Sequence, residues 1–166
     1  MDERAGGSDH EPAVRTGLLA AGLALFAATV LLTSGGRARS ATIKHTCSVT
    51  DKQFIAKTEL DMTSLGSWGE DYRAGDATEA EVIAEARKAA KRVGSLSPSD
   101  PSLQKTKLLV AGMFTEYGRA MWAKAKKKDA APHMYRAYGL ANFAHDVLTD
   151  AKPELLRRGC DVSSLL

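Results

Sequence analysis

The stretch that decides the fold runs from residue 101 to residue 122 and reads PSLQKTKLLVAGMFTEYGRAMW. Its large apolar side chains recur at helical intervals, which place them on one face of an α-helix. These side chains belong to Leu103, Val110, Met113, Phe114, Tyr117, Met121 and Trp122. Pro101 suits the first position of a helix, where a backbone N–H has no intrahelical partner. The stretch therefore predicts an amphipathic helix that ends in the lysine-rich residues 124–128, because positive charge favours a helix C-terminus.

Helical spacing also dominates the residues before this stretch, and no run of β-branched residues with a period of two appears beyond residue 46. We expect a first helix from about Thr50 to Arg73, with Thr50 or Asp51 as its N-cap and Gly75 beyond its C-terminus. Its expected buried stripe consists of Ile55, Met62, Leu65, Trp68 and Tyr72.

Two further helices flank the clearest loop and the lysine-rich run. One opens at Thr78, which forms a capping-box signature with Glu81 three residues later. Residues 94–101, GSLSPSDP, form the loop that follows it. The last helix is expected from Pro132 to Gly159, with an interruption near its end at Pro153.

Four amphipathic helices with short connections predict an all-α fold, an antiparallel four-helix bundle that occupies residues 47–166. Helix-pair repeats of the tetratricopeptide type would give the same local pattern. However, no motif recurs at a period of about 34 residues, so the bundle is the preferred architecture.

An uncharged segment precedes the bundle. Residues 16–34 read TGLLAAGLALFAATVLLTS, and a helix of about 20 apolar residues is long enough to cross a bilayer. No polar stripe runs along it, which argues against a soluble core helix. We therefore expect a disordered leader over residues 1–15, a single transmembrane anchor or signal-anchor over 16–34, and a linker over 35–46.

A cleaved signal peptide is the alternative for this N-terminal region. Ala38-Arg39-Ser40 has small residues at its first and third positions, which fits cleavage before Ala41. The leader is long and acidic, which is atypical of a signal peptide and favours an uncleaved anchor. Lysine and arginine are nearly balanced on the two sides of the segment, so their distribution does not set its orientation.

The two cysteines suggest where the bundle lies relative to the membrane. Cys47 precedes the first expected helix and Cys160 follows the fourth. In an antiparallel bundle with an even number of helices, both chain ends emerge at the same end, so these sulfurs can form a disulfide. Such bonds persist outside the cytosol. The sequence therefore predicts a single-pass protein of the cell membrane with an extracytoplasmic bundle.

Linear motifs of common enzyme classes are absent from the sequence. It contains no His-Glu-x-x-His, Cys-x-x-Cys, glycine-rich phosphate loop or Gly-x-Ser-x-Gly elbow. We therefore expect no catalytic residue, metal site or cofactor. The net charge of +3 is low for a nucleic-acid-binding protein. The expected role is non-enzymatic binding or scaffolding in the cell envelope, toward an envelope protein partner that the sequence does not identify.

Two groups of side chains are candidate sites. Aromatic residues and one histidine form either core or a cleft for a small ligand, and they are Trp68, Tyr72, Tyr117, Tyr135, Tyr138 and His145. The second group is a basic surface, which either is a solvated helix end or attracts anionic lipid. It consists of Lys124, Lys126, Lys127 and Lys128.

Two other functions stay open. The bundle could carry a small ligand or haem, with His145 and either Met62 or Met113 as axial ligands. Alternatively, it could be an accessory subunit of a larger membrane complex, in which residues 16–34 pair with other membrane helices.

Overall fold

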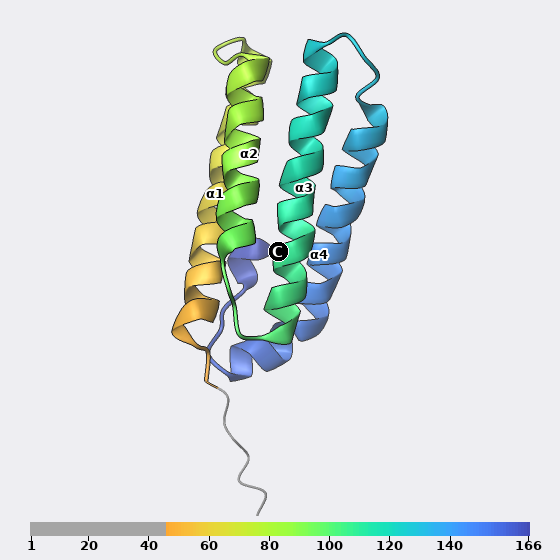
Figure 1. Ribbon diagram of the computed structural model, residues 1–166. Helices are drawn as coiled ribbons and strands as arrows, with labels where there is room; N and C mark the ends of the chain where they lie inside the picture. Colours follow the sequence, from red (N-terminus) through yellow and green to blue (C-terminus); the bar gives the residue numbers. More distant parts are fainter. Residues whose placement is uncertain (1–45) are drawn as a thin grey trace, which may run out of the picture. The chain divides into compact units, whose positions relative to one another are not determined.

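The computed structural model describes residues 46–166, and every regular element in this part of the chain is helical. The helices are α1 (Val49–Ala74), α2 (Glu79–Ser95), α3 (Pro101–Ala125) and α4 (Ala131–Arg157), followed by the short 3-10 helix η1 (Ser163–Leu165). Consecutive helices run in opposite directions, with the α1–α2 and α3–α4 connections at one end and the α2–α3 loop at the other (Figure 1). This arrangement confirms the predicted four-helix bundle.

The predicted leader and anchor, and residues 35–45 of the linker, lie outside the described residues. Among the helices of residues 46–166, none combines the length and the apolar character that crossing a membrane requires. The membrane anchor therefore stays a prediction from the sequence.

The N-terminus of α1 differs slightly from the prediction. Ser48, rather than Thr50 or Asp51, is the N-cap, and Asp51 is the third helical residue. The backbone N–H of Asp51 donates to Ser48 Oγ at 3.0 Å, and the Asp51 carboxylate accepts from the Ser48 N–H at 3.3 Å. This reciprocal capping box places the helix start two residues earlier than a cap at Thr50 would.

The other helix ends largely follow the sequence signals. Thr78 and Glu81 form the predicted capping box of α2, and Asp100 caps α3 ahead of Pro101. Pro153, however, does not interrupt α4, which continues to Arg157. The proline removes only one backbone donor close to the helix end, and the fully buried Leu155 anchors the last turn in the core.

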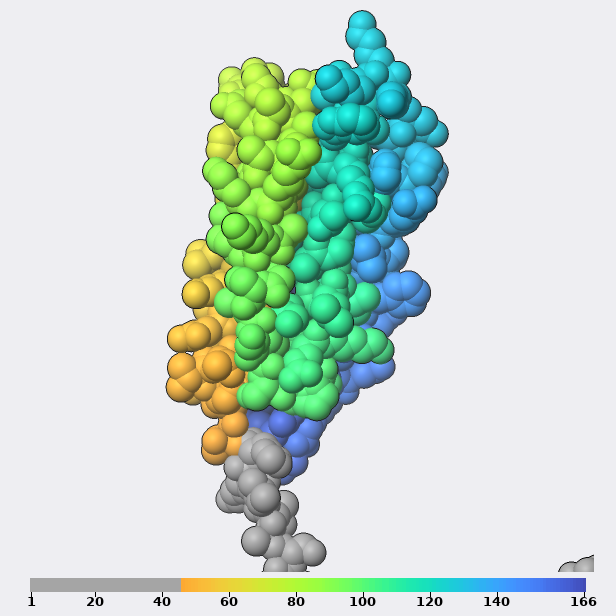
Figure 2. Space-filling view, viewed as in Figure 1, coloured from red at the N-terminus to blue at the C-terminus, as the bar shows by residue number. Residues whose placement is uncertain are grey.

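Helices α2, α3 and α4 pack closely through small residues. A Cβ on Gly118 of α3 would lie 3.4 Å from the Cβ of Ala86 in α2, and one on Gly112 would lie 3.2 Å from Leu140 Cδ1 in α4. Figure 2 shows α2 and α3 side by side along one face of the molecule. The largest fully buried apolar side chains of the core are Phe54, Val82, Val93, Leu103, Phe114, Leu148, Leu155 and Val162.

The C-terminal segment gives the bundle an unusual cross-section. Helix α1 packs on α2, α2 on α3 and α3 on α4, whereas η1 contacts both α1 and α4. Val162 and Leu165 of this returning segment are buried, and the chain end lies midway along the bundle (Figure 1). The segment therefore occupies part of the space in which α1 and α4 would otherwise meet.

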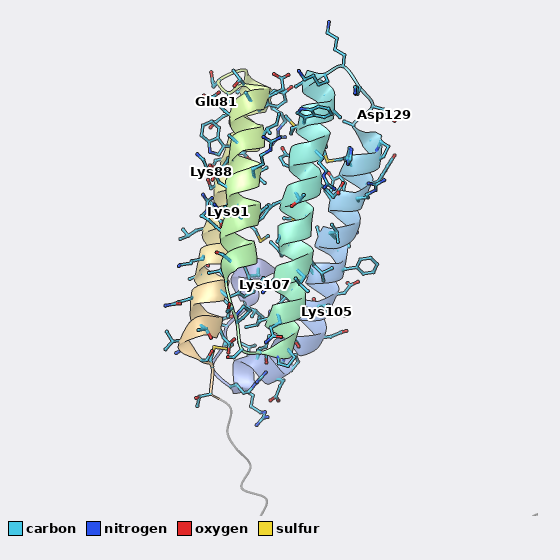
Figure 3. The ribbon with its side chains drawn as sticks, in the orientation of Figure 1. Glu81, Lys88, Lys91, Lys105, Lys107 and Asp129 are labelled. Carbon is cyan, nitrogen blue, oxygen red and sulfur yellow. A yellow bond between two sulfur atoms is a disulfide. The ribbon has the colours of Figure 1, made fainter. Side chains whose placement is uncertain are left out.

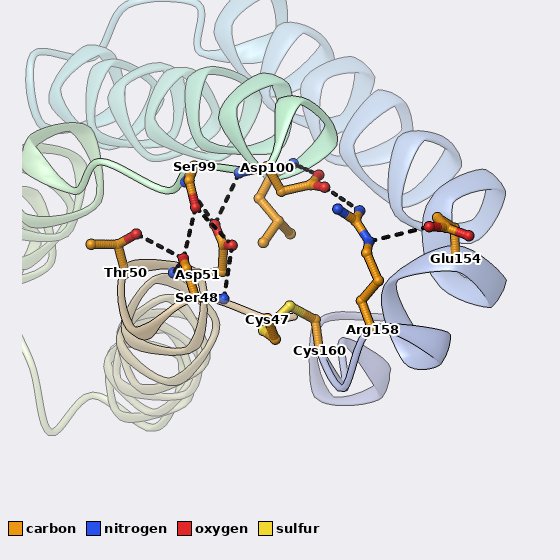
Figure 4. Close-up of a disulfide and its surroundings, with 10 residues drawn as sticks. Cys47, Ser48, Thr50, Asp51, Ser99, Asp100, Glu154, Arg158 and Cys160 are labelled. Atoms are coloured by element: carbon orange, nitrogen blue, oxygen red, sulfur yellow. Dashed lines mark hydrogen bonds and ion pairs between the residues drawn. A yellow bond between two sulfur atoms is a disulfide. The ribbon is translucent and has the colours of Figure 1, made fainter. Parts of the chain in front are cut away.

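A disulfide fixes the start of this segment to the start of α1. Cys47 and Cys160 are bonded, as predicted, with their Cα atoms 5.1 Å apart (Figure 4). The backbone N–H of Cys47 also donates to the carbonyl of Arg158 at 2.8 Å. The Arg158 guanidinium in turn pairs with the carboxylate of Asp100 at the start of α3. The first, third and fourth helices are thus joined at one end.

Asp51 extends these contacts to the α2–α3 loop. Its carboxylate accepts from the backbone N–H groups of Ser99 at 2.7 Å and Asp100 at 3.0 Å, and from Ser99 Oγ at 2.9 Å (Figure 4). Burial alone would raise the pKa of Asp51, but the hydrogen bonds from Ser48, Asp100 and Ser99 together hold this pKa below its ordinary value.

The disulfide should contribute strongly to stability. In the full chain, replacing both cysteines by serine should lower the free energy of unfolding by about 2–5 kcal/mol, because the bond closes a long loop in the unfolded state. Chemical unfolding followed by tryptophan fluorescence measures this difference. Reductant should destabilise the wild type and leave the double serine variant unchanged. Equal stability of the two proteins without reductant would show that the bond is not stabilising.

The Asp51 network predicts a specific pH dependence. Because the pKa of Asp51 is lower in the folded state, its stabilisation is present above the unfolded pKa and is lost as pH falls below about 4. Asp51→Asn should lower the free energy of unfolding by about 2–4 kcal/mol at neutral pH. The side-chain NH₂ group of asparagine would then face backbone N–H groups that now donate to the carboxylate. Urea unfolding at several pH values should show that the difference in free energy of unfolding between wild type and variant becomes smaller in acid. A gap independent of pH would contradict the role of the carboxylate charge.

Candidate functional site

An apolar groove opens between α1 and α4, with α3 as its floor. Its volume is about 580 Å³, within the range of roughly 300–1,000 Å³ that is typical of small-molecule sites. Every methionine of the described residues lines it: Met62, Met113, Met121 and Met134. Methionine side chains are flexible and polarisable, and they are frequent on surfaces that adapt to different apolar partners.

The groove stays open because small residues face it from both walls. Gly66 and Gly69 belong to the α1 wall, and Ala137 and Ala141 belong to the α4 wall. A Cβ on Gly66 would have no neighbour within 4 Å, and one on Gly69 would lie 3.4 Å from the Tyr117 hydroxyl. The gap between α1 and α4 is therefore a consequence of side-chain size as well as of the returning C-terminal segment.

One end of the groove is lined by polar groups. Tyr72, Tyr117 and Tyr138 line it there, together with Arg73. The Tyr72 hydroxyl donates to Glu79 Oε1 at 2.9 Å, and Nζ of Lys124 lies 4.7 Å from the centroid of the Tyr72 ring. Burial raises the pKa of the half-buried Tyr117, while nearby Arg73 and Lys124 act in the opposite direction. Tyr117 therefore stays a neutral hydrogen-bond donor at neutral pH.

A contact between α3 and α4 holds the α4 wall in place. Nδ1 of His133 in the first turn of α4 lies 2.7 Å from Oε2 of the buried Glu116, which also pairs with Arg119. The hydrogen bond from His133 lowers the pKa of Glu116 against the effect of burial, and Arg119 lowers it further. This ion cluster fixes the turn that carries the groove residue Met134.

A smaller cavity of about 240 Å³ adjoins the groove and shares Met62, Met113 and Ala141 with it. His145 lines this cavity, and so does the fully buried Thr58. The Thr58 hydroxyl has no hydrogen-bond partner in the described structure. A buried hydroxyl of this kind is usually satisfied by water or by a ligand, so this mostly apolar cavity offers one polar group to a bound molecule.

The predicted ligand cleft is only partly assembled. Tyr72, Tyr117 and Tyr138 line the groove, and His145 lines the adjoining cavity. Trp68 packs against the core, and Tyr135 is 76% exposed and outside the groove lining. The methionines as a group and the two glycines of α1 were not predicted. The helical spacing of Met62, Met113 and Met121 placed these methionines on the expected buried faces of their helices.

The residues suggested for haem do come together. Met62, Met113 and His145 line the same 240 Å³ cavity, which is smaller than typical ligand pockets. This volume does not favour haem. Elsewhere in residues 46–166, the only close group of potential metal ligands is Cys47, Asp51 and Cys160. There the two sulfurs are bonded to each other, so neither is a thiolate.

The predicted basic surface lies at the C-terminal end of α3. Lys124 covers the Tyr72 ring, and Nζ of Lys128 lies 5.4 Å from the centroid of the Trp122 ring. Both lysines therefore make cation–π contacts. Other lysines lie along α2 and along the opposite end of α3, and Figure 3 labels Lys88, Lys91, Lys105 and Lys107. Positive charge is thus distributed along the bundle rather than confined to its lysine-rich turn.

Comparisons with protein families, with curated proteins and with solved structures found no match for this chain. The groove is therefore interpreted from its own geometry. Its ionisable lining groups are one arginine and three tyrosines, without a carboxylate, histidine or cysteine. Such a lining suits binding of an apolar molecule better than proton transfer or nucleophilic attack.

Two glycine substitutions test whether the groove is open space. Gly66→Ala should raise the free energy of unfolding by up to about 1 kcal/mol, since alanine favours the helix and meets no neighbour. Gly75→Ala is the matched control, because Gly75 has a φ of 90°, which strains any residue with a side chain. This variant should lower the free energy of unfolding by about 1 kcal/mol. Urea unfolding of the full chain measures both. A Gly66→Ala variant less stable than wild type would show that the groove is filled.

Proposed function

We propose that this chain is a membrane-anchored, extracytoplasmic binding protein whose bundle holds a small hydrophobic molecule in the groove between α1 and α4. The observation that carries the proposal is the lining: all methionines of residues 46–166 face one open groove. Met62 is exposed, Met113 and Met134 are half-buried, and Met121 is buried. Leaving apolar side chains of this kind in contact with water is unfavourable unless a partner covers them. The proposed role is non-enzymatic.

The proposed compartment rests on the disulfide and on the N-terminal segment. Cys47 and Cys160 are separated by 113 positions, and structural disulfides of this kind persist in oxidising compartments. Residues 16–34 supply the proposed single-pass anchor. In this proposal the bundle is displayed on the outer side of the cell membrane.

A scaffolding role toward an envelope protein is the second candidate. Where Gly112 meets Leu140, α3 and α4 approach closely. About one turn further toward the disulfide end, Leu108 and Phe143 are 69% and 63% exposed. Two large apolar side chains on adjacent helices favour a protein contact. The same surface would serve an accessory subunit of a membrane complex.

The ligand proposal is tested with methionine methyl groups as reporters. The full chain carries five methionines, so [methyl-¹³C]methionine gives few NMR signals. In phosphatidylcholine nanodiscs, the neutral probe N-phenyl-1-naphthylamine should shift the signals of Met62, Met113, Met121 and Met134. Gly66→Leu should abolish these shifts, because its side chain projects into the open groove.

Gly139→Leu is the matched control. Gly139 also has open space around its Cβ position, but it does not line the groove. This variant should bind the probe like the wild type. Unshifted methionine signals in the wild type, or equal shifts in the Gly66→Leu variant, would contradict the proposal and favour scaffolding.

A further inference from the structure

The groove differs in polarity along its length. From Met62 to Arg73 its α1 wall extends over 12 residues, or roughly 17 Å of helix. At one end stand the tyrosine hydroxyls and Arg73; at the other, the adjoining cavity carries the unpartnered hydroxyl of buried Thr58. Met62, Leu65 and Met113 line the intervening part, whereas Met121 and Met134 lie at the same end as the tyrosines. A ligand that matches this pattern is an amphiphile with a bounded apolar chain.

The polar end carries positive charge. The guanidinium of Arg73 lies 3.9 Å from the Glu70 carboxylate, and these side chains are 77% and 75% exposed. Exposed pairs of this kind are worth little, so Arg73 is free to exchange its partner. Lys124 lies close by, over the Tyr72 ring. Each of these cations lies near a carboxylate, Arg73 near Glu70 and Lys124 near Glu79, and Arg73 is the only charged residue of the groove lining. An anionic group in the groove would therefore bind by taking the place of Glu70 at Arg73.

Hydrogen-bond donors are also available at this end. The Tyr72 hydroxyl is engaged with Glu79. The hydroxyl of half-buried Tyr117 makes no hydrogen bond within the described residues, and it lies 3.4 Å from the Cβ position of Gly69 on the α1 wall. A neutral phenol beside a guanidinium can donate to the same carboxylate that the arginine binds.

We infer that the ligand of the groove is a single-chain carboxylate amphiphile, with its carboxylate between Arg73 and Tyr117 and its hydrocarbon chain along Leu65, Met62 and Met113. This inference rests on the proposed function and names the chemistry of the molecule that the same groove would take. A carboxylate is preferred to a phosphate because one planar guanidinium matches its two oxygens and its single charge. The chain runs toward the Thr58 end, where the adjoining cavity of about 240 Å³ limits its length.

Chain length provides one test. For the full chain in phosphatidylcholine nanodiscs, affinity for saturated carboxylates should rise by up to about fourfold per methylene, because each buried methylene adds apolar contact. The gain should level off once the hydrocarbon reaches the cavity beside Thr58. The shifts of the [methyl-¹³C]methionine signals measure binding from octanoate to octadecanoate. A steady gain through the whole series would contradict a bounded chain site.

Head-group variants provide the decisive test. The ratio of dodecanoate affinity to dodecanol affinity should fall about tenfold in Arg73→Gln and about threefold in Tyr117→Phe. Each compound also partitions into the nanodisc lipid, but to the same extent for every variant. This contribution therefore cancels when the affinity ratios of two variants are compared. Arg157→Gln is the matched control, since Arg157 is an exposed arginine of α4 that pairs with a glutamate three residues before it, as Arg73 does, and lies outside the groove lining. It should leave the ratio within about twofold of wild type.

The outcomes separate this inference from the proposed function. An unchanged ratio in Arg73→Gln, with methionine signals that show an intact fold, would overturn the inference. Tighter binding of dodecyl phosphate than of dodecanoate would overturn the choice of a carboxylate. In either case, normal binding of dodecanol and of the neutral probe leaves the hydrophobic site in place. If no compound shifts the methionine signals, the proposed function fails as well.

Discussion

The groove depends on a covalent constraint at the opposite end of the molecule. The Cys47–Cys160 bond ties the residues after α4 to the residues before α1, and the chain beyond it turns back into the bundle with Val162 and Leu165 buried. These side chains take the place that a direct α1–α4 contact has in a closed bundle. Between α1 and α4, η1 therefore fills the half nearer the disulfide, and the other half is open.

Polar contacts at the disulfide end reinforce this arrangement. Asp51 accepts hydrogen bonds from the loop before α3, and Asp100 pairs with Arg158 beyond α4. Buried acids are costly unless their oxygens are satisfied, so each carboxylate fixes the position of its donors. By contrast, the open end relies on apolar packing and on the Glu116–His133 contact. The bundle is thus held most firmly at the end farthest from the groove mouth.

Much of the bundle could be predicted from the sequence, because capping boxes, Pro101 and helical spacing are local signals. The disulfide was also predictable from an even number of helices. A cleft lined by Tyr72, Tyr117 and Tyr138 was one of two alternatives, the other being core. The sequence could not decide between them, since periodicity shows which side chains share a face but not whether another helix covers that face. Met62 and Tyr72 belong to the expected buried stripe of α1, yet they line the groove. Likewise, nothing local in residues 160–166 signals that they return between α1 and α4.

The disulfide also determines what a protease can release from this domain. The three helix connections, residues 75–78, 96–100 and 126–130, all lie between Cys47 and Cys160 in the sequence. Residues 75–78 and 126–130 are largely exposed, and exposed turns are preferred sites of proteolytic cleavage. A single cut in any of them divides the backbone but leaves both fragments joined through the sulfur atoms. A domain that is cut once in one of these connections therefore stays one covalent unit.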